Sequence, residues 1–208
     1  MKRGPGTLLT TAVLTATLAA GACGPARPET GSAVDACAEG GAALTPGSAA
    51  SALAGSYRLS LAVASGPRAG GSAEGQLVLR PGDQSTAPAA VLGLRDSTVR
   101  HPLVGSLELD PAAVGAAATG DLASADPAAP GVLVIERRPV RPDAAVEITL
   151  RLGAEANRRD VLRFDGGYFA LTVRRLGARG FAGTWASGGA DGVAGAAGGS
   201  FCARRAAG

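Results

Sequence analysis

The sequence predicts an all-β protein in which about eight to ten short antiparallel strands form a meandering barrel. Apolar side chains alternate with polar ones along many short segments, as expected when one face of a strand is buried. Short connections rich in turn residues separate these segments, and short connections favour antiparallel neighbours. No long segment has the periodicity of an amphipathic helix. Closure into a barrel would remove exposed sheet edges, and a two-sheet β-sandwich is the alternative.

The first 22 residues have the parts of an export signal. Lys2 and Arg3 give a positive start, and an uncharged, mostly apolar run follows from Thr7 to Ala20. This run of 14 residues is shorter than the roughly 20 apolar residues that span a bilayer. We therefore expect residues 1–22 to be a signal peptide and the protein to be exported.

The segment LAAGAC, residues 18–23, resembles the lipobox of bacterial lipoproteins, in which small residues precede an invariant cysteine. The resemblance implies that the thiol of Cys23 is joined to diacylglycerol and that the mature chain begins there. It also implies a membrane partner, through the N-terminal lipid, on the periplasmic or outer face of a bacterial cell envelope. Two or more acyl chains hold a protein stably to a membrane, whereas one chain does so only marginally. Ala20-Gly21-Ala22 also satisfies an ordinary signal peptidase, which is the alternative processing.

The three cysteines are Cys23, Cys37 and Cys202. If Cys23 carries lipid, an even pair is left, and an exported protein meets an oxidising compartment in which paired thiols form disulfides. We expect a Cys37–Cys202 disulfide. In the chain-entropy model, closing so long a loop stabilises the fold by about 5 kcal/mol.

The mature chain is predicted to have a tether followed by one domain. Residues 23–45 are rich in proline, glycine and alanine, which is typical of a tether between a lipid and a domain. Residues 46–208 are expected to form the single β-barrel domain. At its start, residues 48–55 (SAASALAG) favour one or two helical turns, with Ser48 as the N-cap and Gly55 as the stop.

The predicted strands each have an apolar face, and the fourth is apolar on both faces. They span residues 57–63, 74–80, 103–109, 132–135, 146–152, 162–165, 169–174, 181–185 and 201–204. Asp165-Gly166-Gly167 predicts a tight hairpin. The weakly patterned residues 112–131 and the glycine-rich residues 188–199 are predicted to be loops.

The segment GFAGTW, residues 180–185, resembles the F-x-G-x-W strands of lipocalin-like and avidin-like barrels. The resemblance implies a barrel architecture and no particular binding residues. Because barrel interiors can hold a small apolar ligand, Tyr57, Phe169, Phe181 and Trp185 are the candidate lining of such a cavity. Ordinary core packing of these aromatic side chains is the alternative.

Catalytic, metal and cofactor sites are not predicted. The one histidine, His101, is followed by Pro102, and the sequence has no G-x-S-x-G nucleophile motif. Without Lys2 and Arg3 the chain has 18 basic and 17 acidic residues in a scattered order, which argues against nucleic-acid binding. We expect a non-enzymatic envelope lipoprotein that binds a small hydrophobic ligand or an envelope protein. The alternatives are a structural or assembly protein with a solid barrel, and a hydrolase.

Overall fold

The computed structural model describes residues 41–82, 97–158, 166–189 and 196–206. These residues form nine strands and three short 3-10 helices. The strands are β1 (Ala42–Ala43), β2 (Gly55–Ser65), β3 (Ser72–Pro81), β4 (Ser97–Glu108), β5 (Val132–Pro139), β6 (Glu147–Leu152), β7 (Tyr168–Gly177), β8 (Gly180–Gly188) and β9 (Ala197–Arg205). The 3-10 helices are η1 (Ala50–Leu53), η3 (Pro111–Val114) and η4 (Glu155–Asn157).

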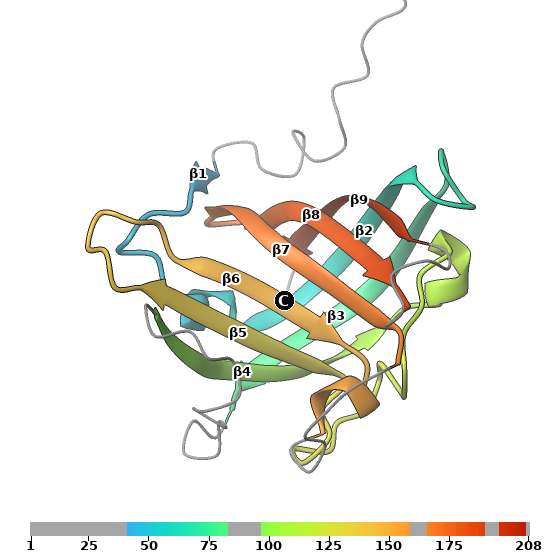
Figure 1. Cartoon of the computed structure of the whole chain (residues 1–208), viewed down its shortest axis with the longest axis horizontal. Helices are drawn as coiled ribbons and strands as arrows, with labels where there is room; N and C mark the ends of the chain where they lie inside the picture. The colour runs from blue at the N-terminus through green and yellow to red at the C-terminus, as the bar shows by residue number, and fades with distance from the viewer. Residues whose placement is uncertain (1–40, 83–96, 159–165, 190–195, 207–208) are drawn as a thin grey trace, which may run out of the picture.

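Eight of the strands close into an antiparallel barrel (Figure 1). Each strand from β2 to β9 pairs with the next, and β9 returns to pair with β2. The predicted meandering barrel is therefore confirmed, and the two-sheet sandwich is wrong because the ring of hydrogen bonds is complete. The short strand β1 lies outside this ring and pairs with β7 through Ala42 and Ala43.

The alternating pattern of the sequence places one side of every barrel strand in a common core. Leu59, Leu107, Ile148 and Leu171 come from four different strands and belong to the same buried cluster. All four side chains are fully buried. Burying one such side chain stabilises the fold by about 2 kcal/mol, so the shared interior is the main source of stability.

The barrel has two ends, which we name by the path of the chain. The proximal end contains the pairing of β1 with β7, the start of β2, the end of β9 and the turn between β7 and β8. At the distal end lie the turn between β2 and β3, the start of β5 and the connection from β8 to β9. Helix η1 lies at the proximal end, and helices η3 and η4 lie at the distal end.

Some element boundaries differ from the sequence prediction. Strand β9 begins at Ala197, four residues before the predicted strand, and β5 continues to Pro139. Strand β1 falls within the range predicted as tether, so the ordered pairing of the domain begins before residue 46. The predicted strand 162–165 and Asp165 of the predicted hairpin lie outside the described residues.

The predicted helical turn forms as η1, but its N-cap is Ala49, which makes no side-chain capping bond. Ser48 is therefore not the N-cap. Its Oγ instead accepts a hydrogen bond of 2.9 Å from the backbone N–H of Thr45, three residues earlier. Because Ser48 closes this preceding turn, the helix begins one residue later than predicted.

Candidate functional site

The four aromatic residues predicted to line a cavity all point into the barrel and are buried. They form two pairs with rings edge to face, an arrangement favoured by the ring quadrupoles. The ring centroids of Tyr57 and Phe181 are 5.0 Å apart, and those of Phe169 and Trp185 are 5.6 Å apart. Phe201 extends the first pair, with its centroid 6.0 Å from that of Phe181. The structure therefore brings the four residues together in pairs of touching rings.

A hydrogen bond holds the indole of Trp185, and a neighbouring glycine leaves room for it. Its Nε1 donates to the carbonyl oxygen of Ala62 at 3.0 Å. A Cβ atom added at Gly199 would lie 2.9 Å from this nitrogen, closer than real side chains approach. Gly199, in the segment predicted as a loop, is thus a strand residue that makes room for the buried indole.

Tyr57 and Arg205 meet at the proximal end. Arg205 Nη2 donates to the Tyr57 hydroxyl at 3.1 Å, and the Arg205 Cζ atom lies 5.3 Å from the centroid of the tyrosine ring. Burial raises the pKa of Tyr57, and the charge of Arg205 opposes this shift in part. Arg205 Nη1 also donates to the carbonyl oxygen of Ala54 at 3.3 Å, which links the end of β9 to the start of β2.

A charged pair inside the barrel rim fixes η1 over the proximal end. Glu136 is only 4% exposed, and its Oε2 accepts a 2.7 Å hydrogen bond from the N–H of Ala50. Arg138 Nε donates to Glu136 Oε1 at 2.8 Å. The other two nitrogens of this guanidinium donate to the carbonyl oxygens of Pro46 and Ser48, both at 2.8 Å. Because its backbone is bonded in this way, η1 places the fully buried side chain of Leu53 over the core.

The pair of Glu136 and Arg138 is absent from the sequence prediction, although the sequence carries a signal for it. Along β5 the inward side chains are Val132, Val134, Glu136 and Arg138 in alternation. A carboxylate on the apolar face of a strand is costly to bury unless it is paired and hydrogen-bonded. Its place in the pattern therefore indicates a specific internal partner.

The distal end is covered by the long connection between β4 and β5. Val114 of η3 is fully buried and Leu122 is 6% exposed. Ser187, at the end of β8, is 1% exposed, and its hydroxyl accepts from the N–H of Ala117 at 2.7 Å and donates to the carbonyl of Ala117 at 3.1 Å. A neutral hydroxyl therefore fastens this cover.

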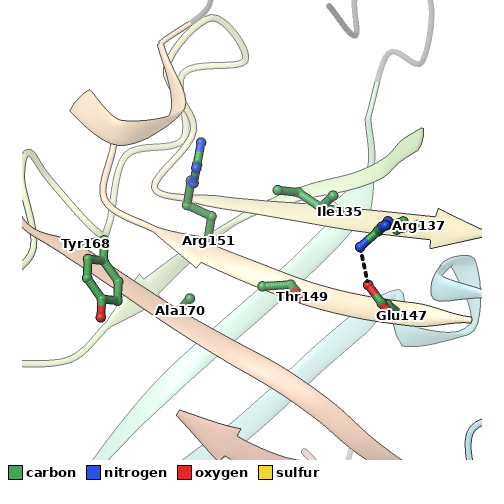
Figure 2. A pocket seen from close by; sticks show the side chains of 7 residues that line it. All are labelled: Ile135, Arg137, Glu147, Thr149, Arg151, Tyr168 and Ala170. Carbon is green, nitrogen blue, oxygen red and sulfur yellow. Dashed lines mark hydrogen bonds and ion pairs between the residues drawn. The ribbon is translucent and has the colours of Figure 1, made fainter. Parts of the chain in front are cut away.

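A shallow groove of about 270 Å³ lies on the outer face of β5, β6 and β7 (Figure 2). Its side chains combine apolar and polar groups, and Arg137 forms a 3.1 Å ion pair with Glu147 within it. The lining residues are Ile135, Arg137, Glu147, Thr149, Arg151, Tyr168 and Ala170. This lining contains hydroxyl, carboxylate and guanidinium groups and no thiol or imidazole. In the sequence, these lining residues occupy outward-facing positions of three consecutive strands.

The remaining predicted residues are only partly described. Cys202 lies on β9, is 5% exposed and is disulfide-bonded. Cys23 and Cys37 lie outside the described residues, so the Cys37–Cys202 pairing and the lipidation of Cys23 stay predictions. His101 is half-buried in β4, where the pairing with β5 shifts register.

Two structural features are absent from the described residues. No group of three or more histidine, cysteine, aspartate or glutamate side chains among them is placed to hold a metal ion. No helix among them has the length and apolar character needed to cross a membrane.

Comparisons of the chain with protein families, curated proteins and solved structures found no match. The function is therefore inferred from the barrel itself. The relevant features are an interior of touching rings, two covered ends and a grooved outer face.

Proposed function

We propose that this chain is an exported, lipid-anchored protein of a bacterial cell envelope whose solid barrel acts through its outer surface. In this role the barrel is a structural or assembly module and holds no ligand inside. The observation that carries the proposal is the packing of the interior aromatic rings against one another beneath two covered ends. A barrel that binds a small molecule needs internal space and a route into it.

The packing of the rings supports the proposal. Phe169, Phe181 and Phe201 are among the largest fully buried side chains, and each lies in edge-to-face contact with another aromatic ring. Ligand pockets typically measure about 300 Å³ or more. An apolar ligand of that size would have to displace these rings, and removal of one such ring costs about 3–5 kcal/mol.

The covered ends support it as well. Leu53 at the proximal end and Val114 at the distal end are both fully buried over the core. Opening the proximal end would break the hydrogen bond from Ala50 to Glu136 and leave a carboxylate without that partner in an apolar rim. Such closure favours surface contacts as the means by which the protein acts.

The anchor part of the proposal depends on the N-terminal sequence. LAAGAC supplies Cys23 for lipidation, and the disulfide of Cys202 is proposed to join it to Cys37. This bond would fix the residues before β1 against the barrel, because Cys202 lies on a barrel strand. The groove on β5, β6 and β7 is the candidate contact site for another envelope component.

A fluorescent-probe experiment tests the solid interior. The chain has one tryptophan, Trp185, which is inside the barrel, so an apolar naphthylamine probe that entered would accept energy from it. We expect no saturable energy transfer for the unmodified protein. Phe169→Ala opens space beside Trp185 and is expected to gain probe binding, because apolar cavities take up apolar molecules. Phe169→Leu is the milder variant, and Tyr168→Leu is the surface control.

Saturable one-to-one energy transfer in the unmodified protein would instead support a hollow, ligand-binding barrel.

The anchor is tested separately by detergent phase separation of the full chain and of Cys23→Ser, expressed in a bacterial host. We expect only the unmodified chain to enter the detergent phase. Equal partitioning of both into the aqueous phase would refute lipidation.

The proposed disulfide has its own test. In the Cys23→Ser protein we expect no thiol that reacts with a labelling reagent without prior reduction. Replacing Cys37 as well is expected to leave one thiol, on Cys202. Two reactive thiols in the Cys23→Ser protein would contradict the pairing.

A further inference from the structure

Six arginines gather at the proximal end of the barrel. They belong to β2, to the β7–β8 hairpin and to the end of β9, and all six are exposed. None of them forms an ion pair with a carboxylate among the described residues. The six are Arg58, Arg174, Arg175, Arg179, Arg204 and Arg205.

Two of these arginines are direct cross-strand neighbours. Arg58 on β2 lies opposite Arg204 on β9, and on the other side of β9 the partner of Arg204 is Gly180 of β8. Neighbouring strands are about 4.8 Å apart, and like charges directly opposite each other destabilise a sheet. This arrangement is unfavourable in the isolated barrel and becomes favourable when an anionic surface covers it.

The carboxylates of the described residues are arranged differently. At the proximal end Glu136, Glu147 and Asp143 each form an ion pair with an arginine outside the group of six. Other carboxylates lie in the connections at the distal end, among them Asp110 and Asp121. Among the described residues, the proximal end therefore carries six exposed arginines without a carboxylate partner.

The chain also enters the barrel at this end. Ala43 pairs with Arg175, and Gly41 lies against Gly177 of the same hairpin. The 18 Cα–Cα steps from Cys23 to Gly41 span at most about 65 Å when the chain is fully extended. Residues 24–40 contain one arginine and three acidic residues, and counting them against the six arginines leaves a net charge of +4. A lipid on Cys23 would thus hold a net positive surface within reach of the membrane.

From these observations we propose that the six-arginine surface is a contact site for anionic phospholipid headgroups of the membrane that carries the anchor. The inference rests on the proposed lipid anchor, and it deepens that proposal by assigning the orientation of the barrel. Guanidinium groups bind phosphate oxygens through paired N–H donors. Anionic lipid surfaces attract basic residues that lie close to them. A single anchor point does not fix the orientation of the barrel, so such contacts set it. The proximal end would face the membrane, and the groove on β5, β6 and β7 would stand beside it.

Vesicle co-sedimentation of the Cys23→Ser protein tests the surface without the lipid. We expect binding to vesicles of phosphatidylglycerol and phosphatidylcholine, little binding to phosphatidylcholine alone, and loss of binding at high salt. Arg58→Gln/Arg204→Gln is expected to weaken binding about 25-fold, because each arginine near an anionic surface contributes a factor of about five. The matched control is Arg68→Gln/Arg158→Gln, which removes the same charge from exposed positions away from the proximal end.

Thermal unfolding followed through Trp185 shows whether both pairs of variants fold. Removal of the opposed charges is expected to leave the Tm of Arg58→Gln/Arg204→Gln unchanged or raised. No preference of the Cys23→Ser protein for anionic vesicles, or equal weakening by the two pairs of substitutions, would overturn the proposal. These results are independent of detergent partitioning, so failure of the basic surface and failure of the lipid anchor are distinguishable.

Discussion

The two ends of the barrel are both covered, but by different chemistry. At the proximal end a four-residue helix is held by the buried carboxylate of Glu136 and the guanidinium of Arg138. At the distal end a longer connection places Val114 and Leu122 over the core and is fastened by the neutral hydroxyl of Ser187. The comparison shows that a short cover relies on strong, charge-assisted hydrogen bonds, whereas a longer cover relies on apolar area.

This difference determines how each end responds to substitution. A charged pair in an apolar rim pays a desolvation penalty, so removing one partner leaves an uncompensated charge. Removing a neutral hydroxyl leaves backbone groups unsatisfied at a smaller free-energy cost. We therefore expect the proximal end to be the more sensitive to single polar substitutions, although it has the smaller cover.

The largest effect is expected for Arg138→Ala. This change removes three hydrogen bonds and leaves Glu136 buried without its cation, which should lower the free energy of unfolding by about 3 kcal/mol. Urea unfolding followed through Trp185 fluorescence measures it. The control is Arg137→Ala, which breaks the exposed ion pair with Glu147 and should cost less than about 1 kcal/mol.

A double substitution sharpens the same point. Glu136→Leu/Arg138→Met removes both charges and should recover most of the stability lost in Arg138→Ala, because apolar residues of similar size replace the pair. Equal unfolding free energies for Arg138→Ala and Arg137→Ala would show that the proximal cover does not depend on the buried charge.

An intermediate effect is expected for Ser187→Ala at the distal end. The backbone N–H and carbonyl of Ala117 lose their partner, with an expected cost of about 1.5 kcal/mol by urea unfolding. Thr184→Ala, an exposed position in the same strand, should change stability by less than about 0.5 kcal/mol. A cost for Ser187→Ala above that for Arg138→Ala would reverse the comparison between the ends.

The smallest effect is expected for Tyr57→Phe, which removes only the hydroxyl bonded to Arg205. At neutral pH the cost should be about 0.5–1 kcal/mol. Because burial raises the pKa of Tyr57, the folded state binds the phenol proton more tightly than the unfolded state. This contribution to stability is fully present below about pH 10 and is lost as pH rises through the folded-state pKa.

Thermal melts between neutral pH and pH 11 measure this dependence. The fall in Tm above about pH 10 should be smaller in Tyr57→Phe than in the unmodified protein. Tyr168→Phe is the matched control, because Tyr168 is 43% exposed and lies outside the barrel. An identical alkaline fall in Tyr57→Phe and the unmodified protein would contradict the assignment.

The extent of prediction from the sequence can be judged at particular residues. Leu59, Leu107 and Leu171 lie on the apolar faces of three predicted strands and share the core, because alternation alone shows which side of a strand is apolar. Gly198 and Gly199 have no side chains and so gave no alternation, which is why β9 begins earlier than predicted. Leu122 lies in a segment without periodicity, and its burial depends on the barrel end that it covers.

The sequence by itself determined the all-β class, the antiparallel meander and the inward face of the strands, because these follow from local periodicity and short turns. Only the tertiary structure decided that the aromatic rings touch, that both ends are covered and that six arginines meet at one end. The physical reason is that alternation gives the direction of a side chain but not the register between strands. Register, together with closure from β9 to β2, sets which residues become neighbours.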